Sequence, residues 1–422
     1  MRWCLPLLLA VVAFAAAPLP TPSTVRVRLL STSAPRSVTL ESDAPLRLLA
    51  GSERLDADAR RIEITARSGR VRVSGADRTL SVDQVHVGAD APLRLRAGRT
   101  DRTYSGSMRV RVVDGRLQVV NEVPLVDYVA SVVASEYPFS EIEGIKAQAV
   151  LARTYVVRRL NPSAAYDIDD HVGAQVYKGA EAVTDRSWSA ASETRGETLT
   201  YGGELAEAVY SSSSGGHTAD NETIWNGRPV PYLRGVPDPY DADSPDHTWT
   251  TTASAREVHR ALSRRYRGSV RGVRVADVSR EGRVRRIALA GSEEISGSDF
   301  RAVVNQALGY RTIRSTRFEL AQRGGDYVFT GRGFGHGVGM SQYGARAQAR
   351  EGRSYRDILA YYFKGTEVTS DPGAAPVASS SRWPTRRSDA RGGQAAADST
   401  IAPPVRRTRP TPRREARTRR GW

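Results

Sequence analysis

Apolar and polar positions alternate along residues 24–120, in stretches such as TVRVRLL, RIEITA and RVRVSG. A period of two places successive side chains on opposite faces, so these stretches predict β-strands with one buried face. The segment VVDGRLQVV carries Asp-Gly between two apolar runs, which is a strong signal for a β-hairpin. Two related stretches, DAPLRLLAG at 43–51 and DAPLRLRAG at 90–98, indicate a duplicated β unit and not a solenoid.

The period changes to three or four residues in VPLVDYVASVVASE, which predicts a helix that Pro138 ends. Its buried stripe comprises Val126, Val129, Val132, Val133 and Glu136. We expect Ser140 and Glu143 to form a capping box for a second helix that Asn161-Pro162 stops. The buried stripe of that helix comprises Ile142, Ile145, Ala149, Ala152 and Val156.

The remainder predicts a mixture of elements. Short strands and loops are expected over 196–252, and a hairpin over VRGVRVADVSREGRVRRIALA turns at Glu281-Gly282. Helices are expected over ASAREVHRALSRRY, SGSDFRAVVNQALG, MSQYGARAQAREG and SYRDILAYYFKG, with Ser354 capping the last. The chain is therefore predicted to be α+β, with a β-rich region (24–120), a mixed domain (121–370) and a disordered tail (371–422).

The net charge and the first residues of the chain indicate which partners it binds and where it is located. The 422 residues carry a net charge of +16, and the Arg/Pro-rich tail holds a large part of it. This suggests an anionic partner: nucleic acid, anionic lipid or an acidic wall polymer. Residues 1–17 read as a secretory signal peptide, with Arg2 ahead of an apolar run. Cys4 is the single cysteine, so the exported chain would form no disulfide and no thiolate metal site.

Glu136 is the first candidate for chemistry. A carboxylate on a core-facing stripe should have its pKa raised by desolvation, which suits a general acid. The alternative is a helix-end glutamate paired with an arginine, for example Arg153. The second helix should place Lys146, Gln148 and Arg153 near Glu136. There they either bind sugars and orient the carboxylate or form a solvated face.

The segment VYSSSSGGHTADN gathers four serines and a histidine. A serine hydrolase would use Ser214 with His217 or His336 and an aspartate, but the G-x-S-x-G elbow is absent. A ligand-binding loop is favoured. No two histidines are spaced as H-x-x-x-H, and a loose metal site with His217, His247 and a carboxylate stays open.

The segment GFGHGVGMSQYGA, residues 333–345, is the richest in glycine. Its spacing completes neither G-x-G-x-x-G nor a G-K-[ST] phosphate loop. Either it is a tight structural turn before a helix, or its backbone passes close to a ligand. In the second case His336 is exposed on the loop, and Ser341, Gln342 and Tyr343 stand at a helix start.

Together these segments resemble the stage II sporulation protein D family, SpoIID/LytB, from about residue 105 to 369. The resemblance rests on NEVPLVDYVASVVASEYP, IKAQAVLARTYVV, YSSSSGGHTADN, STRFEL, GRGFGHGVGMSQYGA and YRDILAYYFKGTEV. It implies an exported lytic transglycosylase of peptidoglycan, acting on glycan strands stripped of stem peptides. The strand-rich N-terminal region would precede a two-lobed catalytic domain with a central groove.

The resemblance also implies residue roles. The glutamate of the family's Glu-x-Pro motif maps to Glu136, and Tyr137 replaces the usual methionine. Such an enzyme works with one carboxylate, whereas glycoside hydrolases normally need two. Glu136, Arg153 and His336 should share one cleft. The expected substrate-binding residues are Lys146, Gln148, Arg153, Ser212, Ser213, His217, His336, Gln342 and Tyr343. Some relatives bind zinc through cysteine and histidine, and without cysteine we expect neither a metal nor another cofactor here.

Partners and a rival function remain as expectations. The runner-up is a non-catalytic glycan-binding protein that modulates a wall amidase. Export to the periplasm, the envelope or the medium argues against a nucleic-acid partner. Residues 24–104 are candidates for an extra wall-binding module. The basic tail either contacts an anionic envelope polymer or lipid, or has no binding partner.

Overall fold

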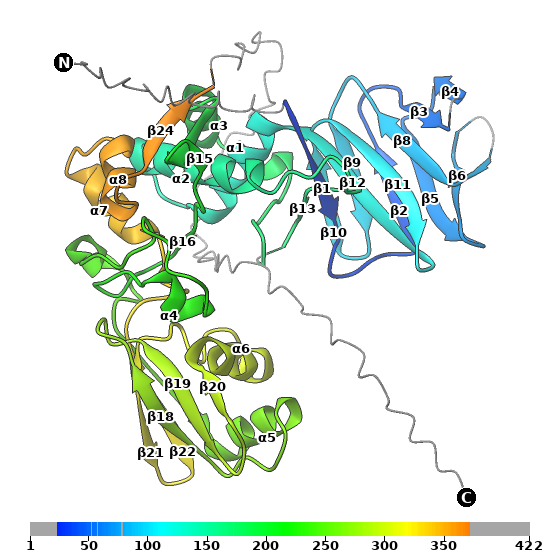
Figure 1. Ribbon diagram of the computed structural model, residues 1–422. Coiled ribbons are helices and arrows are strands. Elements are labelled where there is room, and N and C mark those ends of the chain that lie inside the picture. The colour runs from blue at the N-terminus through cyan, green and yellow to red at the C-terminus, as the bar shows by residue number, and fades with distance from the viewer. Residues whose placement is uncertain (1–22, 52, 57, 77–78, 172, 372–422) are drawn as a thin grey trace, which may run out of the picture.

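The computed structural model describes residues 23–51, 53–56, 58–76, 79–171 and 173–371 (Figure 1). The signal peptide expected over 1–17 lies outside these residues, as does the expected tail beyond Asp371. The described part is α+β, as predicted, and its buried apolar side chains form two clusters. The larger cluster runs from the N-terminal strands through the helices, and the smaller one belongs to residues 249–329.

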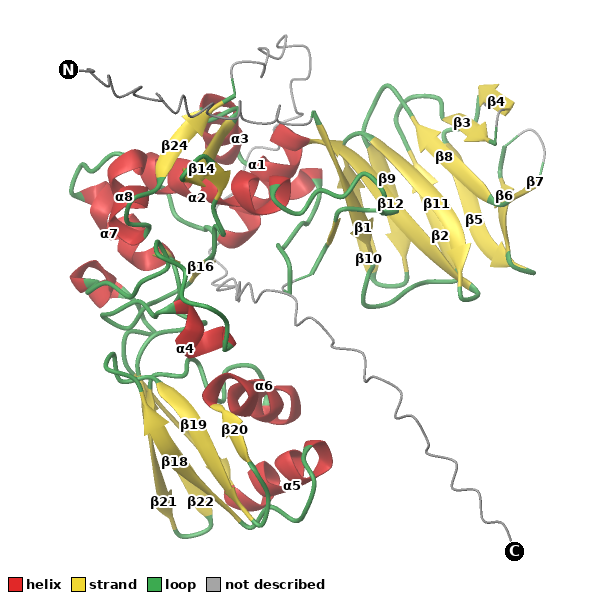
Figure 2. Ribbon diagram, viewed as in Figure 1, coloured by secondary structure: helices red, strands yellow, loops and turns green. Residues whose placement is uncertain are grey.

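Two sheets form the N-terminal β-sandwich (Figure 2). The seven-stranded sheet has the order β13-β1-β12-β11-β8-β3-β4, and the six-stranded sheet the order β10-β9-β2-β5-β6-β7. Alternate residues such as Val25, Val27, Ile62 and Ile64 are fully buried between them, as the period of two predicts. The strands are β1 (Thr24–Leu29), β2 (Ser37–Glu41), β3 (Arg47–Ala50), β4 (Glu53–Asp56), β5 (Arg61–Arg67), β6 (Arg70–Ser74), β7 (Leu80–Val82), β8 (Gln84–Gly88), β9 (Leu93–Ala97), β10 (Thr100–Tyr104), β11 (Ser107–Val113), β12 (Arg116–Pro124) and β13 (Ile168–Asp169).

The two related stretches occupy equivalent places in this sandwich. In the first copy, β2 pairs with β5, and the β3–β4 hairpin crosses to the other sheet to pair with β8. In the second copy, β8 pairs with β11, and the β9–β10 hairpin crosses back to pair with β2. The two copies thus exchange hairpins, which supports the duplicated unit. The predicted hairpin at Asp114-Gly115 joins β11 to β12, with positive φ at both residues.

The chain passes from β12 directly into the helical part. Helix α1 (Leu125–Glu136) is followed by α2 (Ile142–Val157), and both are largely buried. In the predicted stripe of α1, Val129, Val132, Val133 and Glu136 are buried as expected, whereas Val126 is only partly buried. The capping box is wrong, because the N-cap of α2 is Glu141 without a side-chain bond, and Ser140 donates to Glu141 Oε2 instead. Ile142 is also misplaced: it is 38% exposed in the first turn, and α2 is buried only from Gly144 onward.

The remaining elements complete this part and the second cluster. The predicted β18–β19 hairpin and the helices α5, α6, α7 and α8 are confirmed, as is the Ser354 cap. Helices α5 and α6 contact the β18-β19-β20 sheet (Figure 2). The helices are α3 (Asp185–Glu193), α4 (Asn221–Trp225), α5 (Ala255–Arg265), α6 (Gly297–Leu308), α7 (Gln342–Arg350), α8 (Tyr355–Tyr362) and the 3₁₀ turns η1 (Ala180–Ala182) and η2 (Pro239–Asp243). The strands are β14 (Glu197–Tyr201), β15 (Glu204–Leu205), β16 (Tyr210–Ser211), β17 (Trp249–Ser254), β18 (Gly272–Val278), β19 (Val284–Ala290), β20 (Glu294–Ser296), β21 (Phe318–Arg323), β22 (Asp326–Gly331), β23 (Met340–Ser341) and β24 (Glu367–Ser370).

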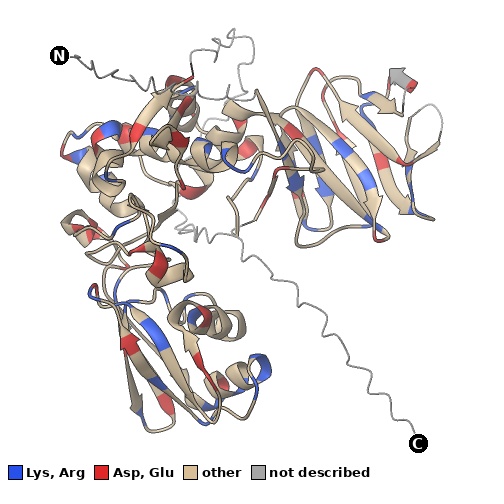
Figure 3. Cartoon of the chain, in the orientation of Figure 1, with Lys and Arg blue, Asp and Glu red and all other residues tan. Residues whose placement is uncertain are grey.

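Charge is unevenly divided between these parts (Figure 3). Residues 24–120 hold 18 arginines against 11 acidic residues, whereas residues 121–370 hold 31 basic and 31 acidic residues. The part that contains Glu136 is therefore neutral overall. The net positive charge of the chain does not locate the site.

Candidate active site

Glu136 is the last residue of α1, and its side chain is fully buried. Its carboxylate Oε1 accepts a hydrogen bond from the Val176 N–H at 2.5 Å. Burial and then the neighbouring Glu136 carboxylate raise the pKa of Tyr210 well above its ordinary value, so the Tyr210 hydroxyl stays protonated beside the carboxylate. The carboxylate therefore sits among polar groups from β16 and from the irregular segment 173–179.

The glycine-rich motif reaches this glutamate through its helix start. The Gln342 side-chain amide donates to the Glu136 carbonyl oxygen at 2.9 Å and to Gln148 Oε1 at 3.5 Å. Gln342 is the first residue of α7, and Gln148 lies on α2, so a helix from a distant part of the sequence meets the consecutive helices α1 and α2 at the end of α1. The structure thus brings together Glu136, Gln148 and Gln342, all of them predicted site residues.

A chain of buried polar groups extends this cluster. The Tyr128 hydroxyl donates to Gln175 Oε1 at 2.9 Å, and Gln175 Nε2 donates to the Tyr210 hydroxyl at 3.4 Å. Sequence reasoning missed Gln175 and Tyr210. Tyr210 adjoins the serine run that the sequence singles out, but Gln175 lies in a segment without periodicity and gives no sequence signal.

Arg153 has a different environment from the one expected. Its guanidinium, 1% exposed, donates to the Ala191 carbonyl at 2.8 Å, the Glu197 carbonyl at 3.2 Å and Thr194 Oγ1 at 3.3 Å. Burial lowers the pKa of Arg153 to about 10. Arg153 therefore joins α2 to the end of α3 and the start of β14, where it satisfies carbonyls that a helix end leaves open.

Lys146 also faces α3. Its ammonium lies 2.8 Å from Glu193 and 3.3 Å from Glu143, and its pKa is raised chiefly by the hydrogen bond to Glu193. Both ion pairs are partly exposed; the first joins α2 to α3, and the second lies within α2.

The serine run and the glycine-rich segment are joined by a buried aspartate, Asp241. Its carboxylate accepts from Ser213 Oγ at 2.8 Å, Ser341 Oγ at 2.9 Å and the Gly215 N–H at 2.8 Å. Strands β16 and β23 pair in parallel beside it. The Ser213 hydroxyl bonds this aspartate directly, without the intervening histidine that a hydrolase triad requires. His247 also contacts Asp241, with Nδ1 at 3.3 Å from Oδ2, whereas Ser214 Oγ, the expected nucleophile, accepts from the Gly216 N–H at 3.1 Å. The hydrolase alternative therefore finds no support in this geometry.

A second buried carboxylate, Asp238, lies next to Asp241. Burial and then the Asp241 charge raise the pKa of Asp238 to about 7. The Tyr362 hydroxyl of α8 donates to it at 3.0 Å. The sequence singles out neither aspartate, because their shared environment forms only in the folded chain.

The prediction that His336 is exposed is wrong. His336 is 5% exposed, its Nδ1 accepts from the Val338 N–H at 3.0 Å, and its ring packs against Trp225. Burial, with smaller effects of the Arg301 and Arg283 charges, lowers the pKa of His336 to about 3, so it is neutral at physiological pH. Glu136, Arg153 and His336 are all buried, so they do not line one open cleft in this conformation.

The glycines of this segment have a structural cause. Gly337 and Gly339 adopt φ of +77° and +72°, and a Cβ would lie 2.1 Å from Arg283 Nη2 and 2.2 Å from the Val209 carbonyl oxygen, respectively. Only glycine fits such a backbone and such contacts. This supports the interpretation as a tight structural turn.

Three predicted residues lie nearer the surface. The Tyr343 N–H donates to the Ser212 carbonyl at 3.1 Å, and the Tyr343 ring meets Phe139 edge-on at 4.9 Å. His217 is half-buried, with Nδ1 at 2.7 Å from the Thr218 carbonyl oxygen. These contacts place Ser212 and Tyr343 at the start of α7, and His217 beyond the serine run.

Neither of two surface cavities lies at Glu136. One, of about 350 Å³, is lined by Arg353, Asp357, Ala360, Tyr361 and Lys364. The other, of about 450 Å³, is lined by Leu49, Ala50, Gly51, Arg70, Val82, Asp83, Gln84, His86 and Arg109. The central groove therefore stays a prediction. Within the described ranges, no group of three or more His, Cys, Asp or Glu side chains is arranged to hold a metal, and no helix has the length and apolarity to span a membrane.

Comparison with known proteins places the chain among relatives. The SpoIID family, described as stage II sporulation protein, matches residues 113–201, which contain Glu136, and a domain of unknown function (DUF8618) matches residues 240–339. Stage II sporulation protein D of Bacillus subtilis is 36% identical over 273 residues, covering 60% of this chain and 76% of the relative. The stage II sporulation protein D of Bacillus amyloliquefaciens is 34% identical over 277 residues, which cover 59% of this chain and 75% of the relative. An amidase enhancer of Bacillus subtilis is 30% identical over 286 residues, which cover 57% of this chain and 40% of the relative. With this identity and coverage, the chain belongs to the stage II sporulation protein D family.

Proposed function

We propose that this protein is exported and acts on the cell wall as a lytic transglycosylase of peptidoglycan, with Glu136 as its acid and base. The observation that carries the proposal is the Glu136 carboxylate, held at the end of α1 beside the Tyr210 hydroxyl and the Val176 N–H. It lies within the region that matches the SpoIID family. The substrate class is a glycan strand freed of its stem peptides.

One carboxyl group suffices for the proposed reaction. Glu136 in its acid form protonates the glycosidic oxygen, and the bond between that oxygen and the anomeric carbon of the muramoyl residue breaks. The resulting carboxylate then takes the proton of the muramoyl 6-hydroxyl, whose oxygen bonds to the anomeric carbon. The products are a free 4-hydroxyl on one strand and a 1,6-anhydromuramoyl end on the other, and no water is consumed.

The burial of Glu136 adds a requirement. A general acid must come within hydrogen-bond distance of the oxygen that it protonates, yet Glu136 has no exposed surface in this conformation. Val176, which bonds the carboxylate, belongs to the irregular segment 173–179. We therefore expect this segment to move when a strand binds, so that a glycosidic oxygen replaces the Val176 N–H.

A second function has an observation in its favour. The full burial of Glu136 also suits a protein that binds glycan without cutting it and modulates a wall amidase. The similarity to the protein named amidase enhancer points in the same direction. The basic tail, with its excess of arginine, would serve either function by contact with anionic envelope polymer or lipid.

The test is mass spectrometry of the products from peptide-free glycan. The wild-type protein should release fragments with 1,6-anhydro ends, and Glu136→Gln should release none while keeping the wild-type circular dichroism spectrum. Anhydro products from the Glu136→Gln variant would refute the role of Glu136. Binding without cleavage by the wild-type protein would favour the amidase modulator.

A further inference from the structure

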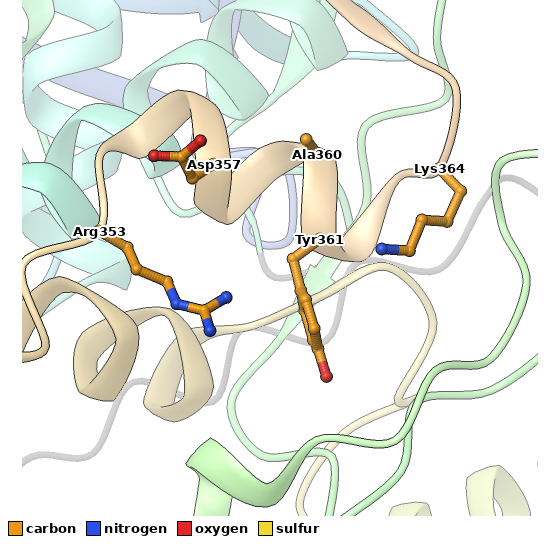
Figure 4. Close-up of a pocket in the computed structure, with 5 residues that line it drawn as sticks. All are labelled: Arg353, Asp357, Ala360, Tyr361 and Lys364. Atoms are coloured by element: carbon orange, nitrogen blue, oxygen red, sulfur yellow. The ribbon is translucent and has the colours of Figure 1, made fainter.

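The cavity of about 350 Å³ beside α8 combines two basic side chains with an aromatic ring. Figure 4 shows Arg353 and Lys364 reaching toward Tyr361 from opposite sides. The Lys364 Nζ lies 5.0 Å from the centre of the Tyr361 ring, and the Arg353 guanidinium carbon 5.8 Å from it. The cavity thus offers positive charge on both sides of an amphipathic ring.

No ion pair within the described part of the chain neutralises these two cations. Among the described residues, neither Arg353 nor Lys364 has a carboxylate within 4.0 Å, although acidic and basic residues are equal in number over 121–370. Asp357 lines the same cavity, but its carboxylate caps α8 by accepting from Ser354 Oγ at 2.6 Å. With the charge of Asp357 counted, the lining still holds one more positive than negative charge, which favours an anion.

The aromatic part is held rigidly. The Tyr361 hydroxyl donates to the Pro237 carbonyl at 2.5 Å, and the ring meets Tyr240 edge-on at 5.5 Å. Arg353 donates to the Tyr240 hydroxyl at 2.5 Å and to Gln348 Oε1 at 3.3 Å. Because Tyr361 and Arg353 are already ordered, a ligand would lose little affinity to ordering these two side chains.

The cavity stands at the far end of α7 from Glu136. Gln342, which bonds the Glu136 carbonyl, begins α7, and Arg353 follows the end of that helix by three residues. Nine residues of helix span about 13 Å at 1.5 Å per residue. An extended ligand of several sugars would reach from one place to the other.

We propose that this cavity is a subsite for an acidic sugar of a glycan strand, in which Lys364 and Arg353 bind a carboxylate and Tyr361 contacts the sugar ring. The inference rests on the proposed glycan substrate. A peptide-free strand carries a carboxylate on the lactyl ether of each muramoyl residue. The ring favours a sugar over a polyol phosphate chain, because the apolar face of a pyranose packs on an aromatic side chain and a linear polyol has no such face.

Equilibrium binding of a peptide-free glycan oligosaccharide tests the subsite, with every protein carrying Glu136→Gln so that no strand is cut. Lys364 is exposed, so its substitution should leave the fold intact. We expect Lys364→Gln to raise Kd about tenfold, the effect of losing one bond between charged groups. The matched control is Arg260→Gln, which removes one exposed charge from α5 and should leave Kd unchanged.

Two further ligands identify the group that is bound. The same oligosaccharide with its carboxylates methyl-esterified should bind equally to the protein with and without Lys364→Gln. The subsite would be overturned if Lys364→Gln left the Kd of the acidic oligosaccharide unchanged. It would also be overturned if Lys364→Gln weakened binding of the esterified oligosaccharide as much as binding of the acidic one. A glycerol phosphate polymer whose binding alone depends on Lys364 would also overturn it. Anhydro products released despite Glu136→Gln would refute the catalytic proposal and not the subsite.

Discussion

Tyr137, the residue that follows Glu136, packs on a glycine of the next helix. Tyr137 is 2% exposed, and a Cβ added to Gly144 would lie 2.0 Å from its hydroxyl oxygen and 2.9 Å from Cζ. Real Cβ atoms do not come closer than 3.0 Å to such neighbours. Gly144 has an ordinary helical backbone, so the space taken by Tyr137, and not φ, is what demands glycine.

The two effects of Gly144→Ala have opposite signs. Alanine in a helix interior is favoured over glycine by about 1 kcal/mol. The overlap with the Tyr137 ring costs about 1–3 kcal/mol, as overpacking of a core typically does. The variant should therefore be destabilised by about 1 kcal/mol. In a Tyr137→Met background the ring atoms are gone, and Gly144→Ala should stabilise by about 0.5–1 kcal/mol.

Urea unfolding of the four proteins of this double-mutant cycle measures the coupling, which we expect to be about 2 kcal/mol. Tyr137→Phe serves as an intermediate case, because it removes the hydroxyl but keeps Cζ. An equal effect of Gly144→Ala in the wild-type protein and in the Tyr137→Met variant would refute the steric argument.

The remaining predictions concern two buried charged groups. Arg153→Met should lower the unfolding free energy by about 3 kcal/mol in urea titration, because the carbonyls of Ala191 and Glu197 lose a charged donor in the core; a loss no larger than that of the exposed Arg260→Met would contradict this. For Asp238, the folded pKa of about 7 lies above the ordinary value of 3.8, so the folded state holds a proton that the unfolded state has released. The protonated Asp238 contributes its full stabilisation below about pH 4. This contribution is lost as pH rises through about 7, which lowers the free energy of unfolding by at most about 4 kcal/mol. Asp238→Asn should remove this slope, so the difference in unfolding free energy between the wild-type protein and the variant should change with pH from about pH 4 to about pH 8. Parallel pH profiles of the two proteins over that range would argue against the assignment.

The elements with a regular period were predictable from the sequence. The alternation of 24–120, the helical stripe around Val129 and the Ser354 cap depend on side chains a few residues apart, so local pattern suffices to find them. The errors lie at boundaries and in exposure. Ile142 fits the α2 stripe by spacing, yet only tertiary contacts decide that α2 is buried from Gly144 onward.

For the candidate site too, local sequence pattern was enough for some features, and others required the folded structure. Sequence pattern was enough to make Glu136, Gln148 and Gln342 candidates for the site, because a carboxylate on an apolar stripe and a motif at a helix start are local features. The folded chain was needed to show that Gln342 bonds the Glu136 carbonyl, although 206 residues separate them. It was also needed to show that Arg153 bonds the end of α3 and that His336 is buried. The physical reason is that a long polar side chain can satisfy its hydrogen bonds with backbone or ligand alike, and only the packing of distant segments determines which of them is within reach.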